Sequence, residues 1–374
     1  MKKVLFIVPY YLPGYRSGGP QRTVENIVDM FGSLNQIYIL TRDHDMGTND
    51  IYPNIKSGWN RVGSANVAYA GNKEYTVKKI VECSESMDMV YACSLFSSCT
   101  IKAIISKKSG LLKCPLMVAS MGVFSDGAIR QKSFKKKAFL CIFKALGMFK
   151  NIKWSFSSEA EKKDAENYLG KIPDYIIAED LPSKVKTFQR RYEKTSGELK
   201  VIFLSRICQT KNLLKCLEIL NTRWNGKIFF DIYGTREDSS YWEKCQELIK
   251  ELNITVNCNY CGEIESSKAA ETFSSYDVFL FPTLGENFGH VIFEALSSGC
   301  VPVISDKTIW NDIEKEGCGR IVPLDDTDKF RENINEFLKM NNDEFKEISD
   351  NAVRYAENKY RSSIEENGYS EIFD

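Results

Sequence analysis

Two glutamates eight residues apart mark the segment of this sequence with the clearest chemical potential. Glu286 and Glu294 lie in FLFPTLGENFGHVIFEALSSGCVPVISD, residues 279–306. We expect a strand that ends at Phe281, a turn, and a helix from about Phe288 to Ser298. At a rise of about 1.5 Å per residue, the two carboxylates are roughly 12 Å apart along the helix axis. This separation is too large for a pair that hydrolyses one glycosidic bond, but it suits two carboxylates that bind hydroxyls at opposite ends of a long ligand.

The start of this predicted helix can bind an anion between the two carboxylates. Its free N–H groups and the positive end of its dipole favour a diphosphate. Gly285 and Gly289 permit a close approach of the backbone. Glu294 has apolar sequence neighbours on both sides, where an unpaired carboxylate is costly. The segment therefore favours a ligand-binding site. The alternative is an amphipathic helix whose glutamates only face water.

A pair of cations follows another predicted strand. Val201–Leu204 is apolar, Arg206 comes directly after its end, and Lys211 opens the next helix. Both cations thus lie at the carboxyl end of a strand, where Arg can bind a phosphoryl group as a fork and Lys as a point charge. Taken alone, two such cations can simply be solvated.

A glycine pair lies between the first strand and the first helix. In PYYLPGYRSGGPQRTVENIV, Gly18 and Gly19 precede Pro20, which suits a helix start. This turn can admit a phosphate or a sugar close to the backbone. It is neither G-x-G-x-x-G nor a Walker loop, so binding of a nicotinamide cofactor or ATP is not supported. A simple tight turn is the alternative.

Composition excludes several classes of protein. The chain has 374 residues, of which 43% are hydrophobic and 27% charged, typical of folded globular domains. Lys and Arg number 50 and Asp and Glu number 50, so the overall positive charge of a nucleic-acid-binding protein is lacking. No apolar run reaches the roughly 18 residues of a membrane span. The apolar run Val4–Val8 is short and ends at Pro9, which favours a buried strand over a signal peptide.

The twelve cysteines do not form a disulfide or metal pattern. They are scattered, mostly in apolar contexts where a free Cys packs as a small hydrophobe. Cys258 and Cys261 form a single C-x-x-C without a second pair or a nearby His, so a zinc site is not expected.

The rhythm of the chain is a short apolar strand, a turn and an amphipathic helix, repeated in two series. Such alternation predicts an α/β fold of two doubly wound parallel-sheet domains. We assign 1–185 to the first domain and 186–359 to the second, and expect about 360–374 to pack back on the first. The predicted strands are Val4–Val8, Ile37–Leu40, Val67–Tyr69, Met89–Tyr91 and Leu116–Ala119, then Leu199–Ser205, Lys227–Tyr233, Ile254–Cys258, Val278–Phe281, Val301–Ile304 and Arg320–Val322.

These features together resemble the retaining glycosyltransferases of family four, especially those of bacterial surface-polysaccharide synthesis. The resemblance rests on ENFGHVIFEALSSG, on the Arg206 and Lys211 pair, on Gly18-Gly19 and on SDKTIWNDI, and it runs from PYYLPGYRSGGP to IVPLDD. It implies a GT-B fold, in which two Rossmann-like domains face each other across a cleft. The C-terminal domain would bind a nucleotide-sugar, UDP- or GDP-linked, and the N-terminal domain a glycan or polyprenyl-diphosphate-linked acceptor.

The resemblance also implies roles for individual residues. Glu294 would bind the nucleotide ribose, Arg206 and Lys211 the diphosphate, and Glu286 the hydroxyls of the donor sugar. The backbone at Asn287, Phe288 and Gly289 would assist Glu286, and Gly18 and Gly19 would approach the donor phosphates. Catalysis would need neither a cofactor nor a metal, because these cations and the helix end stabilise the leaving diphosphate.

The sequence departs from the family at one point. Many members carry a His on the N-terminal domain beside the donor sugar, and related polysaccharide enzymes carry Arg-Gly-Met. Here VASMGVFSDGAIRQK places Met121 in that region without a His. The two histidines are His44, for which we expect a structural role, and His290, which either contacts the donor or is a partnered structural side chain.

A basic amphipathic stretch precedes the middle of the chain. Residues 127–158 contain no acid but eight cations, spread from Arg130 to Lys153 and interleaved with apolar residues from Phe134 to Phe149 at helical spacing. Such a helix can lie on an anionic membrane, which would make the protein a cytoplasmic enzyme on the inner face of the membrane. Alternatively, its apolar side packs on the first domain.

Two other functions share this architecture. A nucleotide-sugar epimerase needs an acid/base set that this His-poor chain scarcely offers. A non-catalytic nucleotide-sugar or glycan-binding module would not need both glutamates and both cations.

Overall fold

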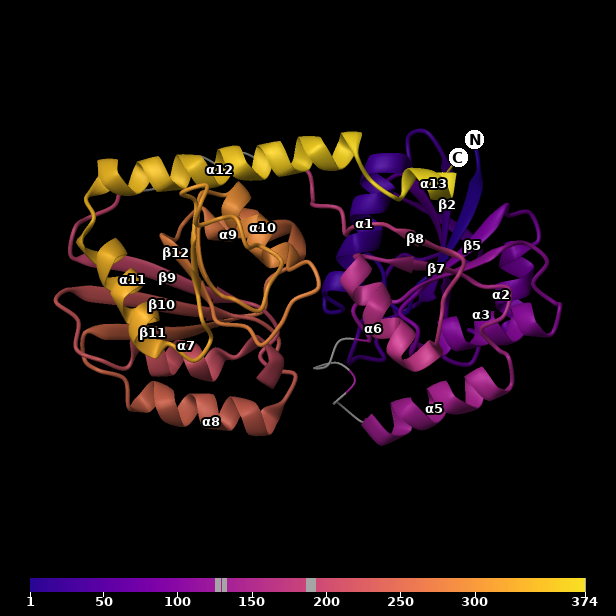
Figure 1. The fold of residues 1–374 in the computed structure, drawn as a ribbon, viewed down its shortest axis with the longest axis horizontal. Coiled ribbons are helices and arrows are strands. Elements are labelled where there is room, and N and C mark those ends of the chain that lie inside the picture. The colour runs from indigo at the N-terminus through magenta and orange to yellow at the C-terminus, as the bar shows by residue number, and fades with distance from the viewer. Residues whose placement is uncertain (125–128, 130–132, 186–192, 374) are drawn as a thin grey trace. The chain divides into compact units, whose positions relative to one another are not determined.

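The protein consists of two compact α/β units. The computed structural model describes residues 1–124, 129, 133–185 and 193–373. The N-terminal unit comprises Met1–Leu181 with Ile364–Asp374, and the C-terminal unit comprises Pro182–Ser363 (Figure 1). Each contains one mainly parallel sheet with helices packed against it, which confirms the predicted fold class.

The sheet of the N-terminal unit has the order β3-β4-β2-β1-β5-β6-β7-β8. Only the β3–β4 pair is antiparallel among these neighbours. Its strands are β1 (Lys3–Ile7), β2 (Gln36–Arg42), β3 (Trp59–Val62), β4 (Ala65–Ala70), β5 (Met89–Cys93), β6 (Leu116–Ala119), β7 (Lys153–Phe156) and β8 (Tyr175–Ile177). The helices of this unit are α1 (Gly19–Phe31), α2 (Val77–Ser84), α3 (Ser98–Lys108), α5 (Ser133–Ala145), α6 (Glu159–Leu169) and α13 (Ser370–Phe373).

The sheet of the C-terminal unit has the order β11-β10-β9-β12-β13-β14, and its neighbouring strands are parallel. Its strands are β9 (Glu198–Leu204), β10 (Lys227–Tyr233), β11 (Val256–Gly262), β12 (Val278–Phe281), β13 (Val301–Ser305) and β14 (Arg320–Val322). Its helices are α7 (Leu213–Leu220), α8 (Ser239–Lys250), α9 (Ala269–Phe273), α10 (His290–Ser297), α11 (Thr327–Lys339) and α12 (Asn342–Glu365), with 3₁₀ turns at Gln209–Lys211 and Ser266–Lys268.

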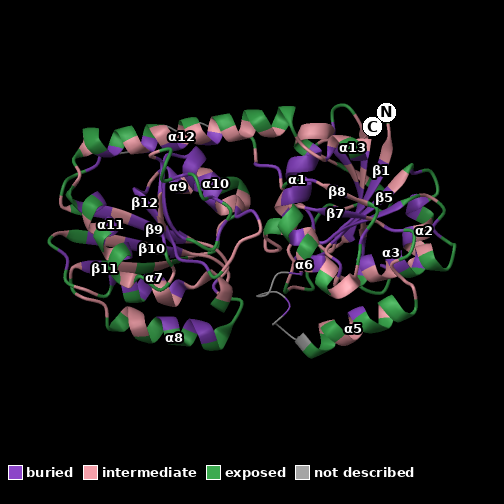
Figure 2. Ribbon diagram, viewed as in Figure 1, coloured by how far each residue is buried: buried purple, intermediate pink, exposed green. Residues whose placement is uncertain are grey.

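Burial explains why the central strands are uniformly apolar. Every residue of β6, β12 and β13 is buried, because helices cover a parallel sheet on both faces. Figure 2 shows the same contrast between buried strands and the exposed outer sides of the helices.

Most predicted strands match the structure, and the differences have local causes. The strand predicted at 254–258 is Val256–Gly262, because Asn253 forms a turn in which its side chain accepts a hydrogen bond from the Thr255 N–H. The strands β3, β7 and β8 were not predicted. These are edge or near-edge strands of three or four residues, too short for a clear apolar run.

The C-terminal tail returns to the N-terminal unit. After α12, Tyr369 and Ile372 are buried in the core of that unit, and the Phe373 ring stacks on Phe31 at 4.8 Å. The chain passes β8 at Gly368, where an added Cβ would lie 1.8 Å from the Ile177 carbonyl oxygen. Only glycine therefore fits at this crossing.

We predict that Gly368→Ala destabilises the N-terminal unit. The new methyl group collides with backbone rather than with a flexible side chain, so we expect a loss of about 2 kcal/mol in the free energy of unfolding. Denaturant unfolding measures this, with Gly19→Ala as the control because a Cβ at Gly19 meets no atom within 4 Å. Equal stability of the two variants would contradict the close approach of Gly368 to the Ile177 carbonyl.

Candidate functional site

The loops after β9 and β10 are joined at the carboxyl edge of the C-terminal sheet. The Ile207 N–H donates to the Thr235 carbonyl at 2.8 Å, which extends the strand pairing beyond both strands. Gly234 has a φ of +148°, and a Cβ there would lie 1.8 Å from the Ser205 carbonyl oxygen. This close approach needs glycine and fixes the two loops side by side.

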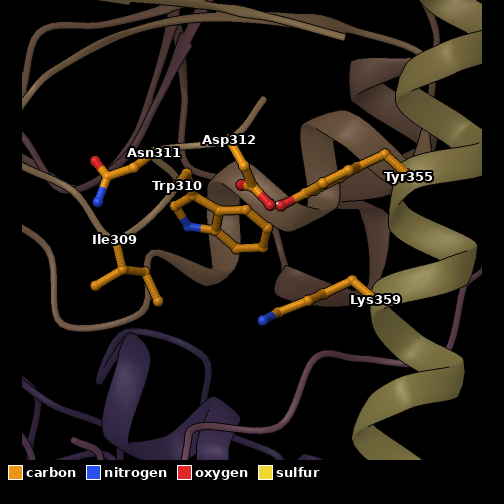
Figure 3. Close-up of a pocket in the computed structure, with 6 residues that line it drawn as sticks. All are labelled: Ile309, Trp310, Asn311, Asp312, Tyr355 and Lys359. Carbon is orange, nitrogen blue, oxygen red and sulfur yellow. Dashed lines mark hydrogen bonds between the residues drawn. The ribbon is translucent and has the colours of Figure 1, made fainter. Parts of the chain in front are cut away.

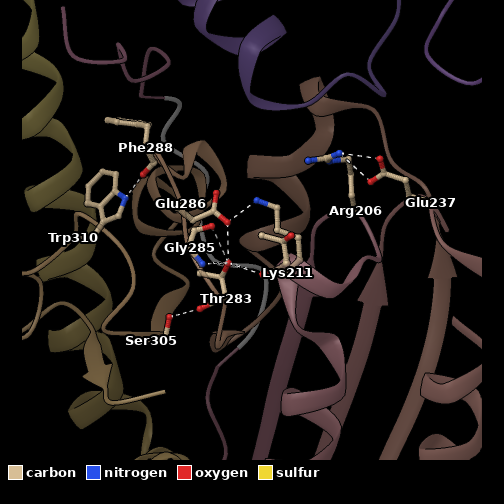
Figure 4. A network of polar contacts seen from close by, with 10 residues as sticks. Arg206, Lys211, Glu237, Thr283, Gly285, Glu286, Phe288, Ser305 and Trp310 are labelled. Carbon is tan, nitrogen blue, oxygen red and sulfur yellow. Dashed lines mark hydrogen bonds and ion pairs between the residues drawn. The ribbon is translucent and has the colours of Figure 1, made fainter. Parts of the chain in front are cut away.

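This arrangement pairs Arg206 with an acid that the sequence analysis did not name. The Arg206 guanidinium donates to both carboxylate oxygens of Glu237, at 2.9 and 3.2 Å (Figure 4). Both side chains are more than one-third exposed. An exposed ion pair contributes little to stability and exchanges readily, so the guanidinium can leave Glu237 for another anion.

The loop after β9 is also joined to the loop after β12. The Leu284 N–H donates to the Thr210 carbonyl at 2.9 Å, and the Asn212 side-chain amide donates to the Pro282 carbonyl at 2.8 Å. Asn212 adopts the left-handed conformation, with φ of 60°, and separates the 3₁₀ turn from α7. These contacts place Lys211 beside the segment that follows β12.

Lys211 and Glu286 form an ion pair in this position. The Lys211 Nζ lies 2.5 Å from Glu286 Oε1, and the two side chains are 14% and 9% exposed. The Thr283 hydroxyl lies 3.1 Å from the same carboxylate oxygen, and Ser305 Oγ donates to the Thr283 carbonyl at 2.6 Å. Figure 4 shows this network at the ends of β9 and β12.

The turn after Glu286 is fixed by an indole. Trp310 is 2% exposed, and its Nε1–H donates to the Phe288 carbonyl at 2.6 Å. Gly289 has a φ of +79° and caps α10, which begins at His290. The helix starts two residues later than predicted, and Glu286 lies in the loop that precedes it, as expected.

Glu294 lies on α10 and is 7% exposed. Its backbone carbonyl accepts hydrogen bonds from Ser297 and Ser298 in the last turn. Of the predicted turn residues, Phe288 is buried whereas Asn287 is half-buried. The structure thus pairs Lys211 with Glu286 at one sheet edge, with Arg206 on the same loop as Lys211 and Glu294 on the helix that follows Glu286.

A pocket of about 140 Å³ opens beside the loop after β13. Ile309, Trp310, Asn311 and Asp312 line it from that loop, with Tyr355 and Lys359 from α12 (Figure 3). The Tyr355 hydroxyl donates to Asp312 at 2.6 Å, which holds the loop against α12. None of the charged residues predicted to bind the donor lines this pocket.

Gly18 and Gly19 lie in the N-terminal unit, at the start of α1. Gly18 has a φ of +74°, a conformation that requires glycine or costs energy, and a Cβ at Gly19 meets no neighbour. The preceding loop is held by the buried Asp45, whose carboxylate accepts from the Tyr15 N–H at 2.9 Å. The space beside the Gly19 backbone, where a side chain would begin, is thus open.

The region that lacks the family histidine is organised by another acid. Glu161 is 6% exposed and accepts hydrogen bonds from Ser120 Oγ at 2.7 Å, from the Gly122 N–H and from Ser157. Met121, between them, has a φ of +55°, which is strained for a side chain of this kind. The turn after β6 therefore depends on Glu161, which the sequence analysis did not single out.

The two histidines have different surroundings. His44 is buried, and its Nδ1 lies 2.7 Å from Asp43, which fits the structural role predicted for it. The His290 ring packs on Phe288 with centroids 4.8 Å apart.

The cysteines form no disulfide in the part of the chain that the structure describes. All twelve are free, and within the described part of the chain no group of His, Cys, Asp and Glu could hold a metal ion. Burial raises the pKa of the Cys258 thiol to about 12, so this member of the C-x-x-C pair is unreactive at neutral pH.

The basic stretch has two apolar faces rather than one. Phe139, Leu140 and Phe143 of α5 pack on the N-terminal core, while Phe134 and Ile142 are 84% and 56% exposed. Arg130 and Lys132 lie outside the described residues. Around the exposed apolar face are the exposed cations Lys135, Lys137, Lys144 and Lys150. Among the described helices, none is both long and apolar enough to cross a membrane.

A signal in the sequence could have revealed Glu237. It follows β10, the sheet neighbour of β9, and groups after the carboxyl ends of adjacent parallel strands lie close together. Trp310 lies in SDKTIWNDI, one of the motifs that carry the resemblance. The contacts of Thr283 and Trp310 could still not be predicted, because they depend on how the loops fold.

Comparisons with known proteins concern the family match and the fold of the chain. Residues 184–359 match the family described as glycosyl transferases group 1. The match covers nearly the whole C-terminal unit, Pro182–Ser363. Over 96% of each chain, the structure is similar to that of HepE from Anabaena in complex with UDP and glucose, with a TM-score of 0.70 and 14% identity. The chain has the GT-B fold.

Two relatives are similar to different shares of this chain. A phosphatidyl-myo-inositol mannosyltransferase of Mycolicibacterium smegmatis is 37% identical over 134 residues, which are 34% of this chain. The alignment spans 33% of that relative's length. An uncharacterised 41.2 kDa protein in the cps region of Klebsiella pneumoniae is 22% identical over 76% of this chain and 78% of its own length.

We predict that Lys211 and Glu286 stabilise the C-terminal unit only together, so that the effects of substituting them are coupled. Lys211→Met leaves the nearly buried Glu286 carboxylate without its cation, so we expect a loss of about 3 kcal/mol in the free energy of unfolding. Lys211→Met combined with Glu286→Gln should recover most of it. Urea unfolding of the four proteins of this cycle tests the coupling.

Arg206→Met is the matched control for this cycle. Its ion pair is exposed, so its stability should stay within about 1 kcal/mol of the unmodified protein. A Lys211→Met variant as stable as Arg206→Met would contradict the assignment of a buried pair.

Proposed function

We propose that this protein is a retaining glycosyltransferase that moves a sugar from a nucleotide-sugar to a glycan or lipid-linked glycan. The observation that carries the proposal is the Lys211–Glu286 pair, next to Arg206, at the carboxyl edge of the C-terminal sheet. In doubly wound sheets this edge is where ligands bind. The match of residues 184–359 to the family described as glycosyl transferases group 1 supports the same reaction class.

The donor in this proposal is a nucleoside diphosphate sugar. The guanidinium of Arg206 exchanges Glu237 for the diphosphate, and Lys211 adds a second positive charge. Glu286 binds hydroxyls of the sugar, and Glu294 binds the nucleotide ribose. The complex of Anabaena HepE with UDP and glucose supports a uridine nucleotide, with a guanosine nucleotide as the alternative base.

Retention requires that the acceptor hydroxyl attacks the anomeric carbon from the face that the diphosphate leaves. The acceptor oxygen forms the new bond, the bond from the anomeric carbon to the phosphate oxygen breaks, and the hydroxyl proton passes to the departing phosphate. Arg206 and Lys211 stabilise the negative charge that develops there. No protein nucleophile is needed, and these cations replace a metal ion.

The acceptor is proposed to be an intermediate of a bacterial surface polysaccharide. The cps-region protein of Klebsiella pneumoniae, similar over three-quarters of this chain, supports that setting. The mannosyltransferase similar to one-third of the chain is named for a phosphatidyl-myo-inositol substrate, which supports an acceptor attached to a lipid.

We predict that release of nucleoside diphosphate depends on an added acceptor. Glu286→Gln and Lys211→Ala should each lower kcat about 100-fold, because both groups act at the reacting centre. Glu294→Ala should mainly weaken donor binding, and EDTA should have little effect. Coupled assays of nucleoside diphosphate release and calorimetry with the donor measure these quantities.

The same assay separates the alternative functions. An epimerase converts its nucleotide-sugar without an acceptor, and a binding module releases no nucleoside diphosphate at all. Full turnover in both Glu286→Gln and Lys211→Ala would overturn the site assignment.

We further propose that the enzyme is cytoplasmic and binds the inner face of the membrane through α5. Its exposed apolar residues and the lysines around them form a surface of the kind that inserts among anionic lipids. Each cation near such a surface contributes roughly 1 kcal/mol. The packed face, with Phe139 and Phe143, keeps the helix attached to the unit.

We predict that the protein floats with vesicles that contain anionic phosphatidylglycerol at low ionic strength, and that high salt releases it. Phe134→Glu with Ile142→Glu should abolish flotation. Leu111→Glu is the matched control, because Leu111 is 52% exposed in the same unit but outside α5. Failure of the unmodified protein to float would remove the membrane proposal.

A further inference from the structure

A guanidinium crosses the carboxyl edge of the N-terminal sheet. Arg42 is the last residue of β2, and the sheet order places β1 between β2 and β5. Its Nη2 donates to Ser98 Oγ at 3.2 Å, at the start of α3 after β5. Its guanidinium carbon lies 5.1 Å from the centre of the Tyr10 ring, which follows β1. Contacts from two neighbouring loops therefore fix the orientation of this cation.

The charge of Arg42 is not neutralised by the acids nearest to it in the sequence. The Asp43 carboxylate lies 2.7 Å from His44 Nδ1. The Asp45 carboxylate accepts from the backbone N–H groups of Tyr15, at 2.9 Å, and Met46, at 2.7 Å. Across the described residues, no carboxylate forms an ion pair with Arg42, whose contacts there are with Ser98 and the Tyr10 ring.

One donor of Arg42 is buried without an acceptor. The Nε–H is shielded from solvent and has no hydrogen-bond partner among the described residues. A buried donor without a partner costs about 1–3 kcal/mol. A guanidinium that its neighbours hold in place matches the oxygens of a phosphate or a carboxylate through its fork of N–H groups.

The loop that supplies Ser98 also contacts the basic helix. Phe96 lies two residues before Ser98, and its ring packs against Phe139 of α5 with centroids 5.7 Å apart. The Lys136 Nζ lies 5.1 Å above the same Phe96 ring. The cation at the sheet edge and the helix proposed to contact the membrane are thus joined through one short loop.

We propose that Arg42, with the Ser98 hydroxyl, binds a phosphate of the acceptor, and that this phosphate belongs to a diphosphate attached to a lipid chain. The proposal rests on the proposed function, since it names the class of acceptor for that reaction. A lipid that lies in the membrane at α5 would present its diphosphate to the neighbouring Ser94–Ser98 loop. This anion site belongs to the N-terminal unit and is separate from Arg206 and Lys211, which are proposed to bind the donor.

Binding of inorganic pyrophosphate to the full chain, measured by calorimetry, tests the site. We expect pyrophosphate to bind at two classes of site, one at Arg42 and one at Arg206 and Lys211. Arg42→Gln should weaken binding at the Arg42 class at least tenfold. Arg42→Lys should also weaken it, because lysine lacks the forked N–H groups of arginine. Arg61→Gln, which removes an exposed arginine on β3 of the same unit, should bind as the unmodified protein does. A normal melting temperature of Arg42→Lys separates lost binding from lost folding.

Arg206→Gln distinguishes this inference from the proposed function. This variant should weaken pyrophosphate binding at the donor site, which contains Arg206 and Lys211, and leave binding at the Arg42 site unchanged. If Arg206→Gln weakens pyrophosphate binding and both Arg42 variants do not, the inference is overturned and the donor site stands. If Arg206→Gln has no effect on donor or pyrophosphate binding, the donor-site assignment fails whatever Arg42 does.

Vesicles identify the source of the phosphate. The unmodified protein should bind neutral phosphatidylcholine vesicles at least tenfold more tightly when they contain polyprenyl diphosphate, and Arg42→Lys should lose this gain. Binding of pyrophosphate in solution without any gain on these vesicles would overturn the lipid-linked acceptor.

Discussion

The ion pair between Lys211 and Glu286 is the contact on which the C-terminal site depends. It joins the loop after β9 to the loop after β12, and both side chains are nearly buried. A buried charge is costly without a partner, so neither loop can move far without the other. The backbone hydrogen bond from Leu284 to Thr210 and the Trp310 indole on the Phe288 carbonyl hold the same edge. The position of the proposed catalytic groups is thus set by loop-to-loop contacts, not by the strands alone.

The two cations of this site differ in how firmly they are held. Arg206 bonds Glu237 in an exposed pair, whereas Lys211 bonds Glu286 in a nearly buried one. Solvent screens the first pair and leaves its guanidinium available to an incoming anion. The second pair keeps its geometry, which suits the proposal that Glu286 holds sugar hydroxyls in a fixed place. The two cations of the loop after β9 thus differ in burial, which fits different proposed roles, binding for Arg206 and positioning for Lys211.

The N-terminal unit places its charges differently. Its acids at the sheet edge are used internally: Asp45 orders the loop before the glycine pair, and Glu161 orders the turn at Met121. Among its exposed cations, Lys135, Lys137 and Lys144 lie on α5 around an apolar face. The net charge of the chain is zero, so any attraction to an anionic surface must come from this local patch. A zero total charge thus coexists with a basic surface on one helix.

The sequence alone determined the alternation of strands and helices, because apolar runs of four to seven residues are what a parallel sheet buried on both faces requires. It also indicated Glu286, Arg206 and Lys211, since strand ends in such sheets converge on one edge. It did not determine that α10 begins at His290, that Glu237 pairs with Arg206, or that α5 has a packed and an exposed apolar face. The start of α10 depends on the left-handed conformation of Gly289. The pair of Glu237 and Arg206 depends on the close approach of Gly234 to Ser205, and the two faces of α5 depend on which side of the helix meets the core. The last two are contacts between distant segments, which no local pattern of residues encodes.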